Sequence, residues 1–308
     1  MEEPFVCRVL TGPTASGKSD LAMQLAEENH WEIICMDSMQ IYRRMDIGTA
    51  KPSPEDRKKV QHHLLDICEP TETYNVSMYI DDAFRKADEL FRAGKEFLFV
   101  GGTGLYLEGM MKPMGMGSVP ADERLRTELH RLAGLPDGRR LLDERLRRCD
   151  PETADRLPLN DIRRRIRAIE VSETTGTPFS RQPHRKKDSP FMWIPVCICP
   201  ERQTLYERIN RRTVRMIENG LAQEVAGLLE SGVPEESQSM QAIGYKEMVP
   251  YLRGEYTLQQ ATELIQTRTR HYAKRQITFL KRLEGIQYAD PDSPDAYNKI
   301  KQILRGNV

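Results

Sequence analysis

A glycine-rich segment near the N-terminus separates a short apolar run, residues 5–10, from an amphipathic run, residues 20–26. Its spacing is Gly-x-x-x-x-Gly-Lys-Ser, and the flanking runs have the patterns of a strand and a helix. The two glycines allow backbone conformations that a side chain would block, so successive N–H groups and a helix N-terminus can converge on one anion. This order of strand, loop and helix predicts a phosphate-binding loop, or P-loop. The predicted loop consists of Gly12, Pro13, Thr14, Ala15, Ser16, Gly17, Lys18 and Ser19.

Two side chains at the end of this loop carry its predicted chemistry. Lys18 adds a full positive charge beside a bound phosphate, and the Ser19 hydroxyl is a suitable ligand for Mg²⁺. The loop alone does not reveal which phosphate compound it holds. A P-loop enzyme that hydrolyses nucleotide usually has a second apolar strand ending in Asp, but the candidate strand here ends in Gly-Gly-Thr-Gly at residues 101–104. That departure weakens an ATPase interpretation.

The order of apolar and amphipathic runs predicts the fold class. Short apolar runs at residues 5–10, 32–36, 96–100 and 192–199 have the character of buried strands. Longer amphipathic runs predict helices at 77–94, 202–219 and 258–283. Because strands and helices alternate, we expect an α/β fold with a doubly wound parallel sheet that carries the P-loop.

The alternation is interrupted in the middle of the chain. After an irregular connector at 112–120, strand character does not return until residue 191. Between them Ile162, Ile166 and Ile169 recur at helical spacing, with arginines on the other faces. We therefore expect a P-loop core domain formed by residues 1–113 and 190–308, and a helical insertion domain at 114–189.

Composition excludes several classes of protein. The 308 residues include 46 basic and 46 acidic side chains, so net charge gives no argument for a polyanionic partner. Two segments are locally basic, 120–187 and 262–282, and are candidate polyanion surfaces. The six cysteines show no zinc or disulfide pattern, and no apolar stretch approaches the ~18 residues of a membrane span. We expect a soluble cytoplasmic protein with no membrane partner.

Polar residues follow two of the predicted strands. Asp37 comes directly after the second strand, and Thr103 lies within the Gly-Gly-Thr-Gly segment. In a doubly wound sheet the carboxyl ends of the strands face the crevice that contains the P-loop. Asp37 is therefore a candidate site residue or, alternatively, a helix N-cap. The glycines around Thr103 permit close approach of a ligand or, alternatively, form a tight strand-to-helix turn.

Beyond the P-loop, several further motifs follow one another along the chain. They are Asp-Ser-Met-Gln-Ile-Tyr at 37–42, Met-Asp-Ile-Gly-Thr-Ala-Lys-Pro at 45–52, His-Leu-Leu-Asp at 63–66, Gly-Gly-Thr-Gly-Leu-Tyr at 101–106, Asn-Asp at 160–161 with Arg164, Arg-Ala-Ile-Glu at 167–170, Gly-Tyr-Lys-Glu at 244–247 and Ala-Lys-Arg-Gln at 273–276. With these motifs, in this order, the chain resembles the tRNA dimethylallyltransferases, also called tRNA isopentenyltransferases, of the bacterial type. The resemblance covers nearly the whole chain and is much more specific than the P-loop alone.

The resemblance implies a reaction. A dimethylallyl group moves from dimethylallyl diphosphate to the N6 amine of adenosine 37, beside the anticodon, so the P-loop holds a leaving pyrophosphate. Asp37 matches the family's general base, and Thr103 its threonine near the reacting amine. Lys18, Mg²⁺ on Ser19 and one arginine would stabilise the charge that develops on pyrophosphate. That arginine is Arg212 by resemblance, although the neighbouring Arg211 remains an alternative.

The resemblance also implies how tRNA is recognised. Ser38, Met39 and Gln40 match the stretch that contacts the extruded base and its neighbours. The helical insertion and the basic C-terminal segment would grip the anticodon stem-loop. Salt bridges within the fold are the alternative role for those basic residues, and Gln276 could serve RNA or the interior. The four candidates are Arg164, Arg167, Lys274 and Arg275.

Two other functions are compatible with the P-loop. A small-molecule kinase would bind ATP at the same loop and would also use Lys18 and Ser19. A tRNA-binding protein without chemistry would require a vestigial loop, although its residues are intact. The resemblance favours the transferase, which we expect to act as a monomer.

Overall fold

The computed structural model describes residues 5–111, 119, 122–182 and 191–306. The chain divides into two compact units, one of Met1–Met111 with Ser189–Val308 and the other of Lys112–Asp188. They are called the core unit and the insertion unit. The expected domain boundaries, at 113–114 and 189–190, lie outside the described residues.

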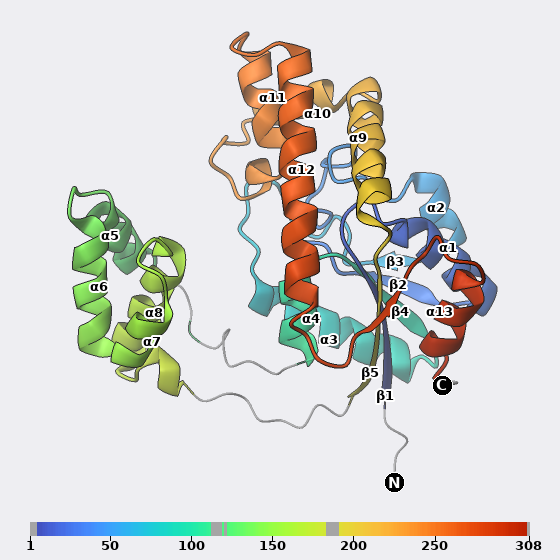
Figure 1. The fold of residues 1–308 in the computed structure, drawn as a ribbon, viewed down its shortest axis with the longest axis horizontal. Coiled ribbons are helices and arrows are strands. Elements are labelled where there is room, and N and C mark those ends of the chain that lie inside the picture. The colour runs from blue at the N-terminus through green and yellow to red at the C-terminus, as the bar shows by residue number, and fades with distance from the viewer. Residues whose placement is uncertain (1–4, 112–118, 120–121, 183–190, 307–308) are drawn as a thin grey trace. The chain divides into compact units, whose positions relative to one another are not determined.

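The core unit is built on a parallel sheet (Figure 1). Within the described residues the sheet has six strands in the order β3-β2-β4-β1-β5-β6, and every pairing is parallel. The chain leaves β1 toward one edge and returns to continue toward the other, so the predicted doubly wound α/β fold is confirmed. The strands are β1 (Phe5–Thr11), β2 (Glu32–Cys35), β3 (His62–His63), β4 (Phe97–Gly101), β5 (Phe191–Ile198) and β6 (Gln287–Ala289).

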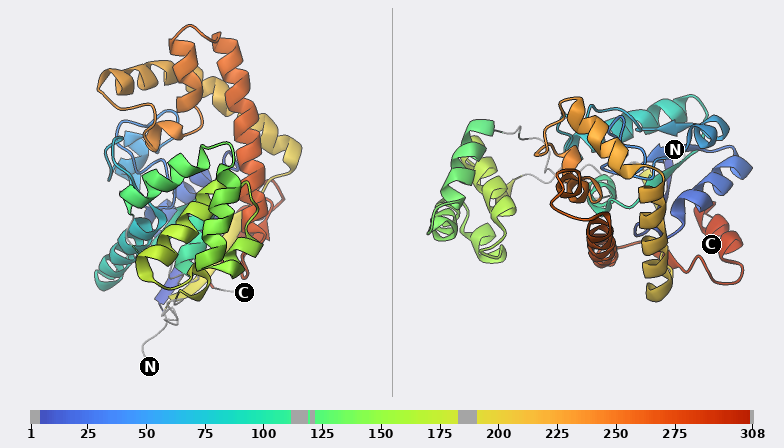
Figure 2. Two further views of the ribbon diagram at one scale, coloured as in Figure 1. Left: turned by 90° about the vertical axis from the view of Figure 1, so that its left-hand side faces the viewer. Right: turned by 90° about the horizontal axis from the view of Figure 1, so that it is seen from above.

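Helices cover both faces of this sheet (Figures 1 and 2). Neighbouring strand residues point to opposite faces. Val9 accordingly belongs to the apolar cluster that includes residues of α3, α4, α10 and α11, whereas Leu10 packs with α1 and α13. The helices are α1 (Lys18–Asn29), α2 (Pro54–Lys59), α3 (Val76–Arg92), α4 (Gly104–Met111), α9 (Arg202–Glu218), α10 (Leu221–Glu230), α11 (Tyr245–Leu252), α12 (Leu258–Leu280) and α13 (Ala296–Leu304).

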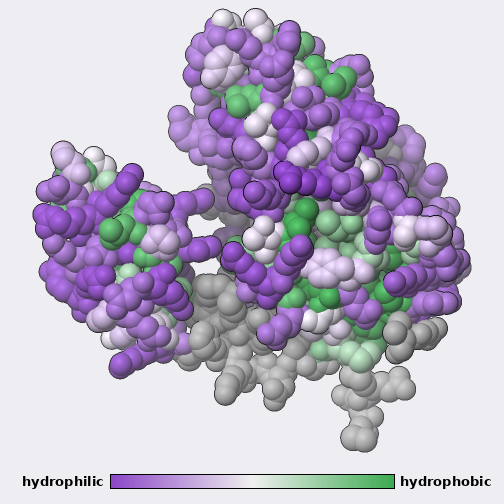
Figure 3. Space-filling model, viewed as in Figure 1, coloured by the Kyte–Doolittle hydropathy of each residue, from purple (hydrophilic) through white to green (hydrophobic). Residues whose placement is uncertain are grey.

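The insertion unit has its own small core. It contains α5 (Glu123–Ala133), α6 (Gly138–Cys149), α7 (Pro151–Arg156) and α8 (Ile162–Thr175). Ile166 and Ile169 are buried in its apolar cluster with leucines of α5 and α6, as the spacing on α8 predicts. Gly176 ends α8 with φ 68°, a conformation that favours glycine. The visible surface of these helices is largely hydrophilic (Figure 3).

Among the described helices, none combines the length and the apolar character that a bilayer crossing requires.

Candidate active site

The P-loop connects β1 to α1 and lies against the ends of two neighbouring strands. Gly12 has φ 152°, and a Cβ atom there would lie 2.3 Å from the carbonyl oxygen of Ile198 in β5. Gly17, at φ 90°, is the N-cap of α1. The buried Thr11 hydroxyl donates to the carbonyl of Gly101, 2.8 Å away, which joins the loop to the end of β4. Glycine is therefore required at both positions by backbone geometry, as the motif predicts.

Several polar groups of this loop have no protein partner. In the part of the chain that the structure describes, the N–H groups of Ala15 and Gly17 donate to no protein acceptor, and the first N–H groups of α1 have none within the helix. The Ser16 hydroxyl is fully buried and has no hydrogen-bond partner there either. Lys18 Nζ donates to the carbonyl of Pro13 at 3.2 Å. Donors and positive charge therefore gather where an anionic oxygen can bind.

Gln276 holds the P-loop from the opposite side. This α12 side chain is 7% exposed. Its Oε1 accepts from the N–H of Thr14 at 2.9 Å, and its Nε2 donates to the carbonyl of Gly102 at 2.8 Å. Of the two roles considered for Gln276, its contacts are those of the interior role. The long C-terminal helix thereby ties the P-loop to the segment after β4.

Three cavities meet around the P-loop. The outer cleft, of about 830 Å³, is lined by the loop and by a row of arginines on α9. The inner cavity, of about 340 Å³, lies at the ends of β2 and β4 and includes Lys18 and Asp37. The helical cavity, of about 320 Å³, is lined by residues of α9, α12 and the segment after β2, and it also includes Asp37. Arg212 lines all three cavities.

The structure distinguishes the two candidate arginines. Arg212 Nη1 donates to the Thr14 hydroxyl at 3.2 Å, and its Nη2 donates to the carbonyl of Thr49 at 3.4 Å. Burial lowers the pKa of Arg212, and the charge of Asp37 opposes that shift. Arg211 is exposed and lines only the outer cleft among these cavities. Arg212 is thus the arginine held beside the P-loop, and its use in catalysis stays a prediction.

Lys18 has a strongly perturbed acidity. Burial, together with the positive charge of Arg212, lowers the pKa of Lys18 to about 8, against an ordinary value of 10.5. Because the protonated form carries the charge, the empty enzyme loses this cation as the pH rises through about 8. We expect kcat/KM for a diphosphate substrate to fall above that pH. A pH profile from 6.5 to 9.5 measures it, and a profile that stays flat to pH 9.5 would contradict the role of the Lys18 charge.

Asp37 combines a structural contact with a position in the site. Its Oδ1 accepts from the N–H groups of Met39 at 2.9 Å and Gln40 at 3.3 Å, which caps the turn after β2. Within the described residues, Oδ2 accepts no hydrogen bond from the protein. The carboxylate also lines both the inner and the helical cavity. Among the described residues no helix follows β2 at this point, so the helix N-cap alternative is not met: Oδ1 caps a turn instead, and the use of Asp37 in the reaction stays a prediction.

Thr103 is bound to the segment that carries Asp37. Its hydroxyl accepts from the N–H of Ser38 at 3.2 Å, and its own N–H donates to the carbonyl of Met36 at 3.4 Å. Of the two alternatives for the surrounding glycines, the observed contacts match the tight strand-to-helix turn, since β4 ends at Gly101 and α4 begins at Gly104. A Cβ at Gly101 would lie 1.9 Å from the Met36 carbonyl oxygen, and one at Gly102 would lie 2.5 Å from Gln276 Nε2. These glycines therefore allow close packing within the chain.

The three residues predicted to contact the extruded base are held differently. Ser38 and Met39 line the helical cavity. Gln40 lines the inner cavity, where its Nε2 donates to the carbonyls of Thr49 and Ala50, each at 3.1 Å. Its amide oxygen accepts from the Cys35 thiol. Gln40 thus has a structural role in addition to any contact with RNA.

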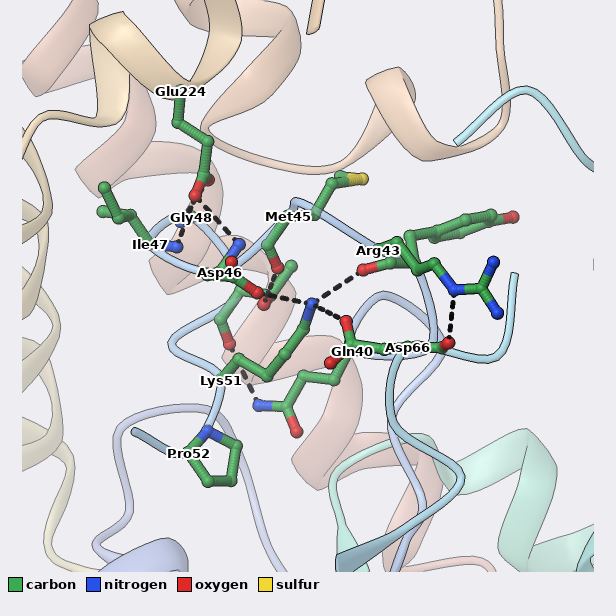
Figure 4. A network of polar contacts seen from close by, with 12 residues as sticks. Gln40, Arg43, Met45, Asp46, Ile47, Gly48, Lys51, Pro52, Asp66 and Glu224 are labelled. Atoms are coloured by element: carbon green, nitrogen blue, oxygen red, sulfur yellow. Dashed lines mark hydrogen bonds and ion pairs between the residues drawn. The ribbon is translucent and has the colours of Figure 1, made fainter. Parts of the chain in front are cut away.

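A buried lysine to which the sequence analysis assigned no role joins separate parts of the segment at residues 42–66 (Figure 4). The side chain of Lys51 has no solvent exposure, and its Nζ lies 2.7 Å from each of three oxygens, the Tyr42 carbonyl, Asp46 Oδ1 and Asp66 Oδ1. Burial alone would raise the pKa of Asp66, but hydrogen bonds from Lys51 and Arg57 outweigh it and hold the pKa below its usual value. The motif at 45–52 was the available signal, but its lysine could not be assigned a partner from sequence.

Removing this buried ammonium is expected to destabilise the protein. In Lys51→Met two partly exposed carboxylates lose a charge-assisted hydrogen bond and the Tyr42 carbonyl loses this donor, while Asp66 keeps Arg57, so the free energy of unfolding should fall by about 1–3 kcal/mol. Urea denaturation measures the change. Lys59→Met, at an exposed position of α2, is the control and should stay within about 0.5 kcal/mol of the parent. A loss below about 1 kcal/mol in Lys51→Met would contradict the prediction.

The basic candidates for RNA contact fall into two groups. Arg167 is paired within the insertion unit, where Nη1 contacts buried Glu170 at 2.7 Å and Nη2 donates to the Val119 carbonyl. Arg164 is 72% exposed and its only ion pair among the described residues is with Asp161, at 3.4 Å. Lys274 and Arg275 are exposed on α12, and Arg275 lines the helical cavity. Arg164 and Arg167 thus both form salt bridges within the insertion unit, which is the alternative role, while Arg164, Lys274 and Arg275 are also exposed.

A divalent ion fits the donor set at the start of α1. Ser19 is exposed there and lines both the outer cleft and the inner cavity. No cluster of three or more His, Cys, Asp or Glu side chains suited to a metal occurs in the described residues. Mg²⁺ typically uses one or two protein ligands and completes its shell with water and substrate phosphate. The Ser19 hydroxyl and the oxygens of a bound diphosphate fit that pattern.

Comparison with known proteins identifies the family. The family model described as "IPP transferase" matches residues 40–283, and the model "Isopentenyl transferase" matches residues 6–73. A tRNA dimethylallyltransferase of Thermotoga neapolitana is 46% identical over 278 residues, which is 90% of each chain. The enzyme of the same name from Thermotoga maritima is 45% identical over 303 residues, or 97% of this chain and 98% of the relative.

Solved structures agree with these matches. A full-length tRNA isopentenylpyrophosphate transferase from Bacillus halodurans superposes with a TM-score of 0.71 at 36% identity, over 99% of this chain and 96% of the other. A eukaryotic dimethylallyltransferase described as acting on tRNA superposes with a TM-score of 0.81 at 28% identity, over 98% of this chain and 79% of the other. The comparisons favour the transferase over a small-molecule kinase. The chain therefore belongs to the IPP transferase family of tRNA-modifying prenyltransferases.

Proposed function

We propose that this protein transfers the dimethylallyl group of dimethylallyl diphosphate to the N6 amine of adenosine 37 in the anticodon stem-loop of tRNA. The observation that carries the proposal is the position of Asp37, which lines both the cavity containing Lys18 and the adjoining helical cavity. A base at this point lies between a site for the diphosphate and a second cavity for the acceptor. The printed names of the relatives, tRNA dimethylallyltransferase, support transfer of a dimethylallyl group to tRNA.

Asp37 is the proposed general base. The adenine amine is a poor nucleophile because its lone pair is delocalised into the ring, so proton removal during attack lowers the barrier. The N6–C1 bond forms while the allylic C–O bond breaks, and its electron pair leaves with pyrophosphate. The N6 proton passes to Asp37. The Thr103 hydroxyl accepts from the Ser38 N–H and so holds the segment that carries the base. Its role near the reacting amine is proposed from its match to the family's threonine.

The P-loop and Arg212 are the proposed diphosphate site. The unpartnered N–H groups, Lys18 and the guanidinium of Arg212 stabilise negative charge as it accumulates on the leaving group. Mg²⁺, held by the Ser19 hydroxyl and diphosphate oxygens, would supply additional charge neutralisation when bound. The chain's own groups orient the diphosphate because they surround it from β1, α1 and α9.

The acceptor adenosine must leave the anticodon stack to reach Asp37. We assign the helical cavity to this base, with Ser38 and Met39 among its contacts. Lys274 and Arg275 on α12, and Arg164 on the insertion unit, are the proposed contacts to the RNA backbone, with Arg167 in a supporting position. We also propose that the protein acts as a monomer on cytoplasmic tRNA.

One assay distinguishes the proposal from its alternatives. The protein is incubated with Mg²⁺, unmodified tRNA, dimethylallyl diphosphate labelled in the allyl group, and ATP labelled in the γ-phosphate. Allyl label in tRNA, located by digestion to adenosine 37, is the expected result. Transfer of γ-phosphate would indicate a kinase, and retention of tRNA without transfer would indicate a binding protein. Either outcome would overturn the proposal.

A further inference from the structure

The carboxylate of Glu224, which lines none of the three cavities, binds the loop at residues 46–48. The next residue of that loop, Thr49, contacts Arg212. Glu224, on α10, accepts through Oε2 from the N–H groups of Asp46 at 2.9 Å and Ile47 at 2.8 Å (Figure 4). Its Oε1 accepts from the N–H of Gly48 at 3.1 Å and from the Tyr245 hydroxyl at 2.5 Å. Three successive backbone donors thus surround one side chain in the way that backbone N–H groups surround a bound anion.

The close packing of Gly48 against Tyr245 requires glycine at this position of the loop. A Cβ atom at Gly48 would lie 2.4 Å from a ring carbon of Tyr245 and 2.8 Å from its hydroxyl oxygen. The loop can therefore approach α11 closely only because residue 48 has no side chain. Hydrogen bonds to a charged acceptor are stronger than those between neutral groups, so Glu224 fixes the backbone of residues 46–48 firmly.

The next two residues, Thr49 and Ala50, connect the fixed backbone of residues 46–48 to the site. The Thr49 carbonyl accepts from Arg212 Nη2 at 3.4 Å and from Gln40 Nε2 at 3.1 Å. The Ala50 carbonyl accepts from the same Gln40 amide at 3.1 Å. Thr49 lines the inner and helical cavities, and Ala50 lines the outer cleft and the inner cavity. The position of these carbonyls helps to set where the Arg212 guanidinium lies.

We propose that Glu224 is a positioning residue, which orients Arg212 toward the diphosphate through residues 46–49 without touching either substrate. The inference rests on the proposed function, because it takes Arg212 as a diphosphate ligand. Glu224→Gln tests it with little change of shape. An amide presents one oxygen and one NH₂ group to four donors, so at least one donor of the loop or of Tyr245 loses its acceptor.

Glu224→Gln is expected to weaken binding of pyrophosphate about tenfold and to raise KM for dimethylallyl diphosphate by a similar factor. The dissociation constant for tRNA should change less than about twofold. Calorimetry with pyrophosphate measures the first quantity without any need for transfer, so it separates failure of this inference from failure of the proposed reaction. Unchanged affinity for pyrophosphate in folded Glu224→Gln would overturn the inference.

A matched control tests whether the effect is only a loss of helix stability. Glu247, on α11, is also a carboxylate that fixes local structure, since it accepts from the N–H of Gly244 at 2.6 Å and pairs with Arg268 at 2.6 Å. It makes no contact with residues 46–50 among the described interactions. Glu247→Gln should lower the melting temperature while leaving pyrophosphate affinity within about twofold of the parent. An equal loss of affinity in both variants would overturn the inference.

A double-mutant cycle identifies Arg212 as the intermediary. If Glu224 acts through Arg212, Glu224→Gln should cost less than about twofold in pyrophosphate affinity when Arg212 is already alanine. A full tenfold loss in that background would overturn the inference. Should Glu224→Gln not fold, Tyr245→Phe removes a single donor to the same carboxylate. It is expected to weaken pyrophosphate binding about threefold, again only when Arg212 is present, and no effect would overturn the inference.

Discussion

Asp37→Asn is expected to reduce the rate of dimethylallyl transfer by about 10²–10⁴-fold, the usual contribution of a positioned general base. Asparagine retains an oxygen that can accept from the N–H groups of Met39 and Gln40, so the turn after β2 should survive. The amide cannot accept the proton of the adenine amine. The reduction in transfer rate should therefore appear in kcat.

Single-turnover kinetics with preformed enzyme–tRNA complex measures this effect separately from binding. The dissociation constants for tRNA and for pyrophosphate should remain within about threefold of the parent values. Asp20→Asn is the control, because Asp20 is an exposed carboxylate that lines the same inner cavity and carries the same charge. If Asp37→Asn transferred at a rate within about threefold of the parent, Asp37 would not be the base.

Arg212→Ala is expected to lower kcat/KM for dimethylallyl diphosphate by about 10²–10³-fold, the range found when one preorganised donor to a developing anion is removed. Arg212 lines all three cavities and contacts the P-loop through Thr14. The positive charge of Arg212 is therefore held where negative charge develops on the leaving pyrophosphate. Weaker product inhibition by pyrophosphate should accompany the loss, since product and transition state share this contact.

Arg211→Ala provides the matched comparison, because it removes the same group from the next position of α9. Arg211 is exposed and lines only the outer cleft among the three cavities, so its removal should change kcat/KM by less than about threefold. Circular dichroism checks that both variants remain folded. Equal losses in the two variants, or a larger loss in Arg211→Ala, would contradict the assignment of Arg212.

Local sequence was sufficient for the strands and helices with strong patterns. The predicted strands at 5–10, 32–36, 96–100 and 192–199 correspond to β1, β2, β4 and β5 within one or two residues. By contrast, β3 and β6 contain two and three residues, too few for a periodicity to be seen. These edge strands form because neighbouring strands offer unpaired backbone groups, and that is a property of the assembled sheet.

The residues of the candidate site also divide into those that local sequence identified and those that depend on the assembled fold. Gly12, Gly17, Lys18 and Asp37 could be named from motifs because their chemistry is local to a turn or a helix start. Glu224 could not be assigned a role, and the two roles of Gln276 stayed open, since the backbone groups that they bind lie at least 174 residues away in the sequence. The partners of Lys51 are nearer in the sequence, but they meet only when residues 42–66 fold on themselves. The glycines at 101, 102 and 104 illustrate the limit, because a glycine pattern does not reveal whether a ligand or the chain itself fills the space.

The amino-acid sequence by itself determined the P-loop, the alternation that produces a doubly wound sheet, and the motifs that place the chain in its family. These features depend on backbone conformation and on periodic burial, which act over a few residues. Only the tertiary structure decided that Arg212 rather than Arg211 faces the loop, that Gln276 lies in the interior, and that Glu224 holds residues 46–48. Each of these depends on side chains brought together by the packing of α9, α10 and α12 on the core, over separations that local pattern does not encode.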